Sequence, residues 1–346
     1  MVIEAPPETK FRIIREVTVR DANLLNIKWL CNIAGVSRSG YYNWLSHEPA
    51  RAKREGKDQA DFAMILAAYR FRGYDKGGRG IYMRFLHQSP PVVMNLKKIR
   101  RLMKKYGLKC PIRRANPYRR MAKALKTSNV APNLLNREFR VHGPRKVLLT
   151  DITYLFFGDY QKCYLSTILD AYTKEILSYA VSGSLEVDFV LETVNLLLEK
   201  HGLSLQAETL INSDQGSHYT SYKFIQIIKD ANLRQSMSRR ANCWDNAPQE
   251  SFFGHMKDEI VIHGCDTYEQ VRAIIDDWMD YYNNDRYQWD LAYLSPNEFY
   301  RYTQTGKYPL SVRVPCNERI NGGAAPEPPE FNALVSKEGI EKGETQ

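Results

Sequence analysis

The second half of the chain alternates short apolar runs with amphipathic stretches, and this pattern predicts strands and helices in a mixed order. Alternating runs bounded by turn residues predict a three-stranded meander, and 3.6-residue spacing predicts the helices that follow. The predicted strands are 146–157, 162–170, 175–181, 209–213 and 235–237, and the predicted helices are 185–200, 221–230, 248–259 and 268–283. Because three strands precede the first helix, the pattern indicates an α/β fold with a mixed five-stranded sheet.

The first half of the chain has helical spacing instead. Residues 27–45 predict a helix, a glycine turn and a second helix capped by Ser37, which is the shape of a helix-turn-helix. Its second helix would offer DNA the side chains of Arg38, Tyr41, Tyr42 and Asn43. The alternative is a plain helical hairpin whose core contains Trp29, Tyr41 and Trp44.

Basic side chains dominate the segments that follow. The helix predicted at 96–106 carries Lys97 and Arg101 on a strongly basic face, for which a merely solvated surface is the alternative. Residues 109–126 hold no acid and include two prolines, which predicts an extended basic linker. We expect four arginines of this linker to contact DNA phosphates, namely Arg113, Arg114, Arg119 and Arg120.

The formal net charge of +10 is unevenly divided along the 346 residues. Residues 1–145 hold 31 Lys and Arg against 10 Asp and Glu, whereas residues 146–346 hold 18 against 29. This division predicts a polyanion-binding N-terminal half joined to an acidic domain. No apolar run approaches the roughly 20 residues that span a bilayer, and no signal-peptide pattern is present, so we expect a cytoplasmic protein without a membrane partner. Six cysteines without CxxC spacing indicate neither a zinc ribbon nor a disulfide framework.

Three acidic residues stand where an unpaired charge is costly. Asp151 interrupts an apolar strand, Asp214 ends another, and Glu250 opens a helix, with 35 residues between the last two. A carboxylate in so apolar a setting is paired or binds a cation. Hard cations such as Mg²⁺ prefer carboxylate oxygens, and two ions about 4 Å apart can activate an attacking oxygen and stabilise a leaving one. We therefore predict that these three carboxylates form a metal site.

Three further side chains near these acids have candidate roles. Lys257 follows Glu250 by two helical turns on the same face and would contact phosphate, with an ordinary surface lysine as the alternative. His218, four residues after Asp214, would touch the DNA substrate or pack locally. Asp170 ends the second strand, and we assign it to turn capping rather than to catalysis.

The contexts of the three acids closely resemble the DDE transposases of the bacterial insertion-sequence-three family, which are relatives of retroviral integrases. The resemblance is carried by Thr150–Tyr154, Ser213–Tyr219 and Asp245–Phe253, together with the D-35-E spacing. Further matches are Gly35–Tyr42, the basic helix near Arg100, Tyr281–Gln288 and Ser295–Phe299. The resemblance covers about residues 25–302.

This resemblance implies metal-dependent cutting and joining of DNA. Asp151, Asp214 and Glu250 would be catalytic and would ligate two Mg²⁺ or Mn²⁺ ions in a ribonuclease-H-like core. Family members nick a strand at an element end and use the freed 3′-hydroxyl to attack another strand, without a covalent protein intermediate. The expected partners are double-stranded DNA, as terminal inverted repeats and as target, and further copies of the chain in at least a dimer. The expected location is the bacterial cytoplasm, in association with the nucleoid.

The chain departs from the family at several points. No heptad run precedes residue 25, so the chain resembles the product of a second reading frame alone. Gln249 stands where a methionine is common, and the zinc module of retroviral integrases is absent. The alternative functions are therefore a DNA-binding regulator of a full-length transposase, without effective catalysis, and a nuclease that only hydrolyses DNA.

The predicted organisation has five regions. They are a helix-turn-helix-like region at 1–60, a basic helical DNA-binding region at 61–108, a basic linker at 109–145, a ribonuclease-H-like core at 146–303 and a flexible tail at 304–346.

Overall fold

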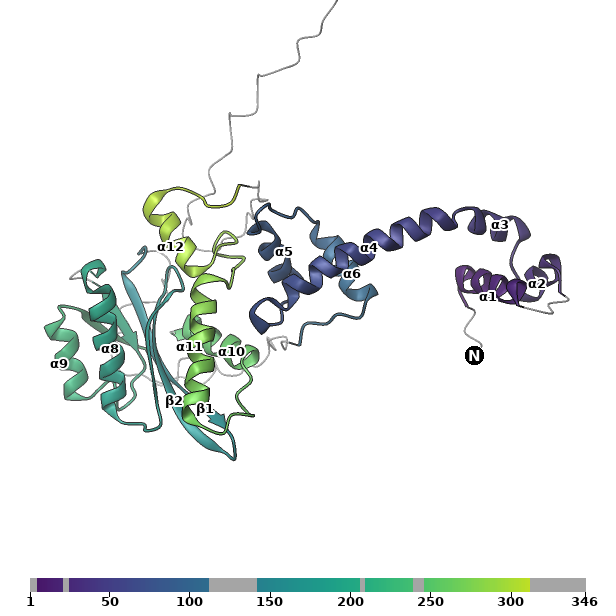
Figure 1. Cartoon of the computed structure of the whole chain (residues 1–346). Helices are drawn as coiled ribbons and strands as arrows, with labels where there is room; N and C mark the ends of the chain where they lie inside the picture. Colours follow the sequence, from purple (N-terminus) through teal and green to yellow (C-terminus); the bar gives the residue numbers. More distant parts are fainter. Residues whose placement is uncertain (1–4, 21–24, 112–141, 206–208, 239–245, 312–346) are drawn as a thin grey trace, which may run out of the picture. The chain divides into compact units, whose positions relative to one another are not determined.

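The structure of the chain is a computed structural model that describes residues 5–20, 25–111, 142–205, 209–238 and 246–311 (Figure 1). It forms two compact units, residues 1–66 and 67–346. Most of the predicted tail lies outside the described residues, and so do the linker arginines Arg113, Arg114, Arg119 and Arg120. The region boundaries expected at 60, 108, 145 and 303 stay predictions. None of the described helices is both long enough and apolar enough to cross a membrane.

The first unit contains the two helices and the glycine turn that the sequence predicts. Its helices are α1 (Pro7–Val19), α2 (Ile27–Ala34), α3 (Arg38–Ser46) and the first part of α4 (Glu48–Tyr69). Gly35 ends α2 in the left-handed region at φ 64°, which glycine adopts at little cost. The Ser37 hydroxyl accepts a hydrogen bond from the Gly40 amide at 3.0 Å and so caps α3.

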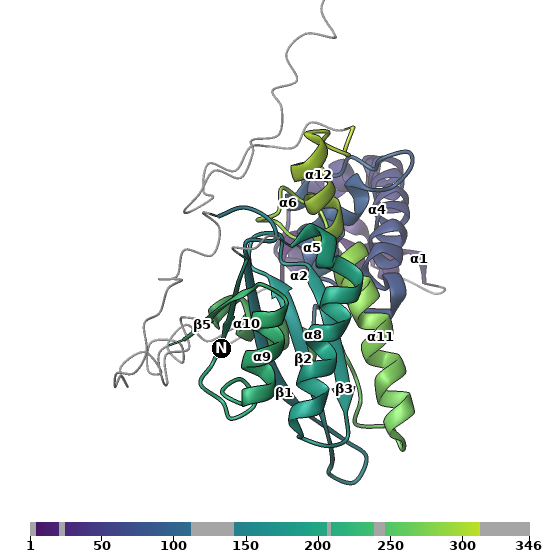
Figure 2. The same cartoon turned by 90° about the vertical axis from the view of Figure 1, so that its left-hand side faces the viewer.

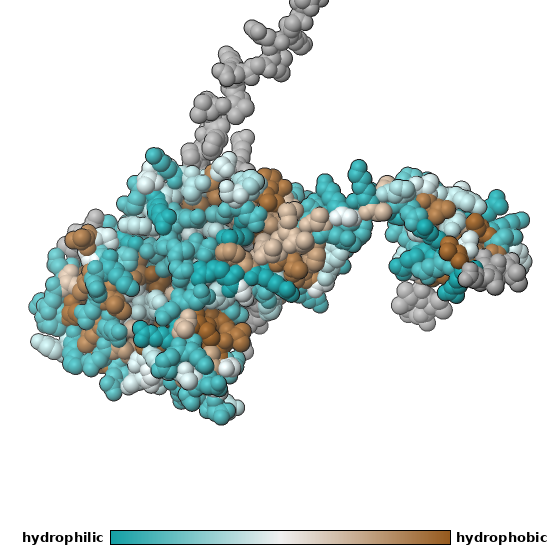
Figure 3. All heavy atoms as spheres, viewed as in Figure 1, coloured by the Kyte–Doolittle hydropathy of each residue, from teal (hydrophilic) through white to brown (hydrophobic). Residues whose placement is uncertain are grey.

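Tyr41, which we expected to contact DNA, lies in the core of this unit instead. Tyr41 is only 2% exposed and packs against Phe11 and Trp44, so its side chain does not face solvent. The hairpin interpretation correctly placed Tyr41 and Trp44 in this core, but it was wrong for Trp29, which is 61% exposed. The reason is helical phase, because Trp29 lies on the side of α2 opposite the buried Cys31. Figure 3 shows hydrophobic side chains at the surface of this unit.

The second unit contains the predicted basic helix. Its first elements after α4 are η1 (Phe71–Gly73), α5 (Gly78–Leu86) and α6 (Leu96–Lys105). The Asn95 side chain caps α6, and Gly107 follows it with φ 69°. The apolar side of α6 is buried through Ile99, Leu102 and Met103. Lys97 and Arg101 are exposed, so the basic side of the helix is open to a partner.

These helices pack in the same unit as the sheet. Arg72 forms ion pairs at 2.8, 2.8 and 3.0 Å with three acids of α11 (Tyr268–Asn284) and its end, namely Asp277, Asp280 and Asp285. The Tyr74 ring stacks on the Tyr281 ring with centroids 4.5 Å apart. The segment before the basic linker is therefore attached to the core that follows the linker.

The predicted mixed five-stranded sheet is confirmed. Its strands are β1 (Val147–Phe157), β2 (Gln161–Asp170), β3 (Ile176–Ser182), β4 (Leu210–Ser213) and β5 (Arg234–Met237). They lie in the order β3-β2-β1-β4-β5. The meander β1, β2 and β3 is antiparallel, whereas β4 pairs in parallel with both β1 and β5. A crossover helix precedes each parallel strand, as parallel pairing requires.

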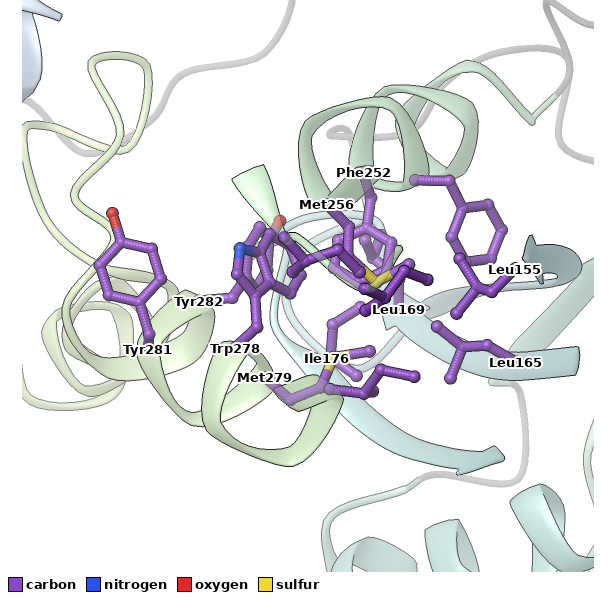
Figure 4. Close-up of a cluster of buried hydrophobic side chains, with 14 of the residues drawn as sticks. Leu155, Leu165, Leu169, Ile176, Phe252, Met256, Trp278, Met279, Tyr281 and Tyr282 are labelled. Carbon is purple, nitrogen blue, oxygen red and sulfur yellow. The ribbon is translucent and has the colours of Figure 1, made fainter. Parts of the chain in front are cut away.

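Helices cover both faces of this sheet (Figure 2). The even-numbered β1 residue Leu148 packs in one cluster with α8 (Val187–His201) and α9 (Tyr222–Asp230). The odd-numbered residues Leu149 and Leu155 pack in a second cluster with α10 (Ala247–Glu259) and α11, which Figure 4 shows. A last described helix, α12 (Pro296–Thr305), is capped by the Ser295 side chain. This alternation of strand residues between two cores determines which face carries each acid of the site.

Candidate active site

Asp151 lies in β1, and Asp214 directly follows β4, the strand that pairs in parallel with β1. β1 and β4 pair with Leu149 opposite Asn212, so continuing this register by two residues brings Asp151 opposite Asp214. Residues two apart along a strand point to the same face, and Leu149 lies in the cluster with α10. Asp151 is therefore directed to the α10 face of the sheet, and Asp214 lies close enough for its charge to raise the pKa of Asp151.

Glu250 approaches this same face from the helix. It stands in the first turn of α10, where Pro248 occupies a position that needs no amide donor. Farther along α10, Phe252 and Met256 pack against the β1 side chains of the second cluster. Glu250 and Asp214 are exposed whereas Asp151 is half-buried, so solvent reaches the site.

The charges of these residues act on one another. The pKa of Asp151 is raised to about 7, chiefly because burial disfavours its carboxylate. The Ile152 amide donates to Asp151 Oδ1 at 2.8 Å and opposes this rise. Repulsion from Asp214 and Glu250 raises the pKa further, and attraction to Lys257 lowers it. The three acids and Lys257 therefore share one electrostatic site, in which an added cation would be stabilised.

Lys257 lies on the same helix as Glu250 and responds to the same charges. Burial lowers the pKa of its ammonium group, and the charge of Asp151 raises it. The two residues are seven positions apart, which brings them to the same side of α10. Although its ammonium group is partly desolvated, the residue is exposed overall, and a cation there is well placed to meet a phosphate.

The loop after β4 holds Asp214 in a tight turn. Asp214 Oδ1 accepts a hydrogen bond from the Gly216 amide at 2.9 Å. On the opposite side of the loop, the fully buried Tyr219 lies with its hydroxyl 3.4 Å from Thr150 Oγ1. Burial raises the pKa of Tyr219 well above its usual value, and repulsion from Asp151 raises it further. Tyr219 therefore stays neutral and packs against β1 through its contact with Thr150.

α10 is fixed at its far end by a second network. Glu259 accepts hydrogen bonds from Arg286 and, at 3.1 Å, from Trp278 Nε1. Its side chain is only 5% exposed. The helix that carries Glu250 is thereby attached to α11 and to the segment that follows it.

The donor chemistry of this site fits a divalent cation. Three carboxylates on one side of the sheet supply the hard oxygen ligands that Mg²⁺ or Mn²⁺ prefers. Among the residues that the structure describes, however, no three His, Cys, Asp or Glu side chains are gathered closely enough to hold a metal ion. The pairing register brings the two aspartates together, whereas the metal-ligand roles of all three acids stay predictions.

Three of the remaining residues that the sequence singled out have local contacts or exposure that the structure describes. His218 Nε2 lies 3.2 Å from the Leu185 carbonyl oxygen, which matches the local-packing alternative. Asp170 Oδ1 accepts from the Tyr172 amide and Oδ2 from the Thr173 hydroxyl, which is the turn-capping role assigned to it. Arg38 is exposed at the start of α3 in the first unit.

Two side chains support the site in ways that the sequence did not predict. Tyr219 lies within the motif around Asp214, but only the structure shows that it supports Thr150. Gln249 is fully buried and donates a hydrogen bond to Thr167 on β2. The sequence signal that could have indicated the role of Gln249 is that it is a polar residue among the apolar positions of α10.

Comparison with known proteins agrees with this architecture. Two family models, each described as "Integrase core domain", match residues 141–243 and 250–303. The chain is 31% identical over 272 residues to the 31 kDa protein of insertion element IS600 from Shigella sonnei, a match that covers 78% of this chain and 97% of that protein. It is 28% identical to the transposase InsF for insertion sequence IS3A from Escherichia coli, with 79% of this chain and 93% of that protein covered.

A solved structure with a similar fold is the HTLV-2 integrase catalytic core domain in complex with magnesium. It is 14% identical, and the match covers 46% of this chain and 99% of that one. The TM-score is 0.35, and we base no conclusion on this likeness.

Proposed function

The chain belongs to the insertion-sequence-three family of transposases and carries their integrase core, and from this premise we propose that its chemistry centres on Asp151, Asp214 and Glu250. Its function is DNA transposition and integration, and its enzyme class is that of a polynucleotidyl transferase. The observation that supports the residue assignment is the parallel pairing of β1 with β4, which runs to two residues before Asp151 and Asp214 on the sheet that packs against α10, the helix of Glu250.

The proposed reaction has two steps. In the first, water attacks a phosphodiester at an element end and breaks its bond to the 3′-oxygen, which leaves as a 3′-hydroxyl. In the second, this 3′-hydroxyl attacks a phosphodiester of another strand, forms a new P–O bond and displaces the 3′-oxygen of that strand. Asp151, Asp214 and Glu250 would hold two Mg²⁺ or Mn²⁺ ions, which when bound activate the attacking oxygen and neutralise charge on the leaving one. The three carboxylates would orient the reacting groups by fixing the positions of these ions.

Lys257 is proposed to bind the phosphate next to the scissile bond. It is exposed and lies on the same side of α10 as Glu250. A lysine acts on phosphate as a point charge, so it can stabilise a developing negative charge without fixing the geometry. We assign His218 a secondary contact with the same DNA strand.

The basic segments are proposed to bind the DNA outside the site. The exposed Lys97 and Arg101 of α6 would contact the phosphate backbone, and Arg38 of α3 would contact DNA from the first unit. The linker residues Arg113, Arg114, Arg119 and Arg120 are assigned the same partner because they belong to a stretch without acids. Since two element ends must be joined, we propose at least a dimer, acting on terminal repeats and target DNA of the bacterial nucleoid.

A joining assay tests this proposal. The protein is incubated with labelled element-end DNA and Mg²⁺, and the products are separated on a denaturing gel. Joined strands are the expected product, and they should be lost in Asp214→Asn and Glu250→Gln. Cleavage without joining would indicate a nuclease, and a mobility shift without chemistry would indicate a DNA-binding regulator. Unchanged joining in both variants would refute the assignment of the carboxylates.

A further inference from the structure

The first turn of α10 is attached to the sheet in an unusual way. Asn246 at its N-cap makes no side-chain hydrogen bond to that turn, although side chains cap α3, α6 and α9. Instead, Gln249 Nε2 donates to Thr167 Oγ1 of β2, and both side chains are fully buried. This hydrogen bond links the start of α10 to β2.

The link ends beside a proposed catalytic residue. In the antiparallel pairing of β1 and β2, Thr167 lies directly opposite Asp151. Directly opposite residues have Cβ atoms about 5 Å apart and point to the same face. Gln249 therefore attaches α10 to the sheet next to Asp151.

The neighbour of Gln249 on α10 is Glu250. Successive residues of an α-helix are turned by about 100° around its axis, so a fixed direction for one side chain fixes the direction of the next. With Gln249 held against β2, Glu250 is directed to the side of the helix where solvent reaches the site. The rotation of α10 is thereby coupled to the position of Asp151.

Stability alone does not explain a glutamine at this position. Gln249 Oε1 is buried without a hydrogen-bond partner, and such a group is costly to desolvate. A methionine has the same length and would avoid that cost among the neighbouring apolar side chains Phe252 and Phe253. Polar groups kept at a cost to stability are typical of sites where function sets the geometry.

We propose that Gln249 is a positioning residue, whose hydrogen bond to Thr167 sets Glu250 relative to Asp151 for metal binding. This inference rests on the proposed function, because it assumes that these two acids share a divalent cation. In this proposal the Thr167 hydroxyl on β2 positions Glu250 as well, because it accepts the hydrogen bond from Gln249.

The test compares Gln249→Met and Thr167→Val with the unaltered full-length protein. The first readout is the increase in Tm that Mn²⁺ produces in DNA-free protein, and the second is the Mg²⁺ concentration for half-maximal joining. Removal of a group that orients a metal ligand typically weakens metal affinity 10–100-fold, and we expect about 10-fold for each variant. Without metal, we expect Gln249→Met to melt no lower than the unaltered protein.

Three further variants make the result specific. Thr167→Ser keeps the hydroxyl and should retain the metal response of the unaltered protein. The double variant Gln249→Met/Thr167→Val should be no worse than either single variant, because both remove the same hydrogen bond. Gln288→Met is the matched control, since Gln288 is also buried and donates to a hydroxyl, that of Tyr282, on another part of the core.

The inference is overturned if Gln249→Met and Thr167→Val lower the Tm but leave both metal responses unchanged. It is also overturned if the effects of the two variants simply add. If Asp151→Asn and Glu250→Gln also retain joining and the Mn²⁺ response, the proposed function itself fails. Loss of both in those two variants, with normal Gln249→Met and Thr167→Val, rejects only the positioning role.

Discussion

Glu259 and Arg286 form a buried ion pair, with Glu259 Oε1 2.8 Å from Arg286 Nη2 and 3.0 Å from its Nε. Their side chains are 5% and 17% exposed. The pair connects the last turn of α10 to the segment after α11. Because α10 also carries Glu250, this pair supports the proposed site from the far end of the helix.

Removal of one partner of this pair should destabilise the core. Glu259→Ala would leave the Arg286 guanidinium buried without its counter-charge, a change that typically costs about 3–5 kcal/mol. We expect a loss of that size in the free energy of unfolding, measured with urea and tryptophan fluorescence.

The exposed pair between Asp188 and Lys223 provides the control. Its atoms lie 3.1 Å apart, and its side chains are 69% and 67% exposed. Water screens such a pair, so Asp188→Ala should cost less than about 1 kcal/mol. Equal losses in Glu259→Ala and Asp188→Ala would show that the buried pair has no special role in stability.

A methyl group at Gly216 should disturb Asp214. A Cβ added at this glycine would lie 2.9 Å from Asp214 Oδ1, closer than such atoms approach in proteins, so the carboxylate would have to move. We expect Gly216→Ala to slow joining about tenfold, which corresponds to about 1.4 kcal/mol of the barrier. The measurement is the initial rate of joining at saturating Mg²⁺.

Gly183→Ala is the matched control for Gly216→Ala. Gly183 lies in a loop of the same core, and an added Cβ there would meet nothing within 4 Å. Its joining rate should equal that of the unaltered protein. Gly216→Ala with the same rate as Gly183→Ala would indicate that the turn does not hold Asp214 in its working position.

The charge of Asp151 should make the metal-free protein less stable as pH rises. Its folded pKa of about 7 lies above the ordinary value of 3.8, so the folded state binds this proton more tightly than the unfolded state does. Stability from this group is therefore present at acidic pH and is lost as pH rises from about 4 to about 7. Asp151→Asn removes the titrating carboxyl group. The Tm of this variant should therefore exceed that of the unaltered protein at pH 8 but not at pH 4.

Thermal melting in chelator at these two pH values measures this effect. Added Mn²⁺ should raise the Tm of the unaltered protein at pH 8 and should have a smaller effect in Asp151→Asn, because a cation replaces the proton as the partner of the carboxylate. A Tm difference between the two proteins that stays the same at pH 4 and pH 8 would contradict the raised pKa.

The sheet could be predicted because its signals are local. The predicted strand 146–157 differs from β1, Val147–Phe157, by one residue, since each strand is a short apolar run bounded by turn residues. The two aspartates were found in the same way, because a carboxylate in such a run is conspicuous. Their alignment follows from the register of β1 and β4, which the sequence alone does not determine.

The contacts that support the site depend on tertiary packing instead. Gln249 and Thr167 are 82 positions apart, and no local pattern predicts that they meet. Tyr41 was expected to contact DNA, but the phase of α3 directs it into the core. Likewise, the attachment of Arg72 to Asp277 joins segments 205 positions apart. Pairings over such separations become visible only when the fold brings the segments together.

The exposed basic side of α6 should contribute to DNA affinity through phosphate contacts. Lys97 and Arg101 are both exposed on this helix, whose other side is buried. Each phosphate contact releases condensed counterions, so log K falls with log salt by about one unit of slope per contact. We expect Lys97→Ala/Arg101→Ala to weaken binding to DNA of any sequence and to reduce the salt slope by about 2.

The comparison for this prediction is Lys223→Ala/Lys229→Ala, which removes the same charge from the exposed side of α9. Both double variants lower the net charge equally, so a general loss of electrostatic attraction would affect them alike. Fluorescence anisotropy of labelled element-end DNA at several salt concentrations measures the two slopes. A reduced slope confined to the α6 variant assigns direct phosphate contacts to that helix, whereas equal slopes in both variants would remove α6 from the DNA interface.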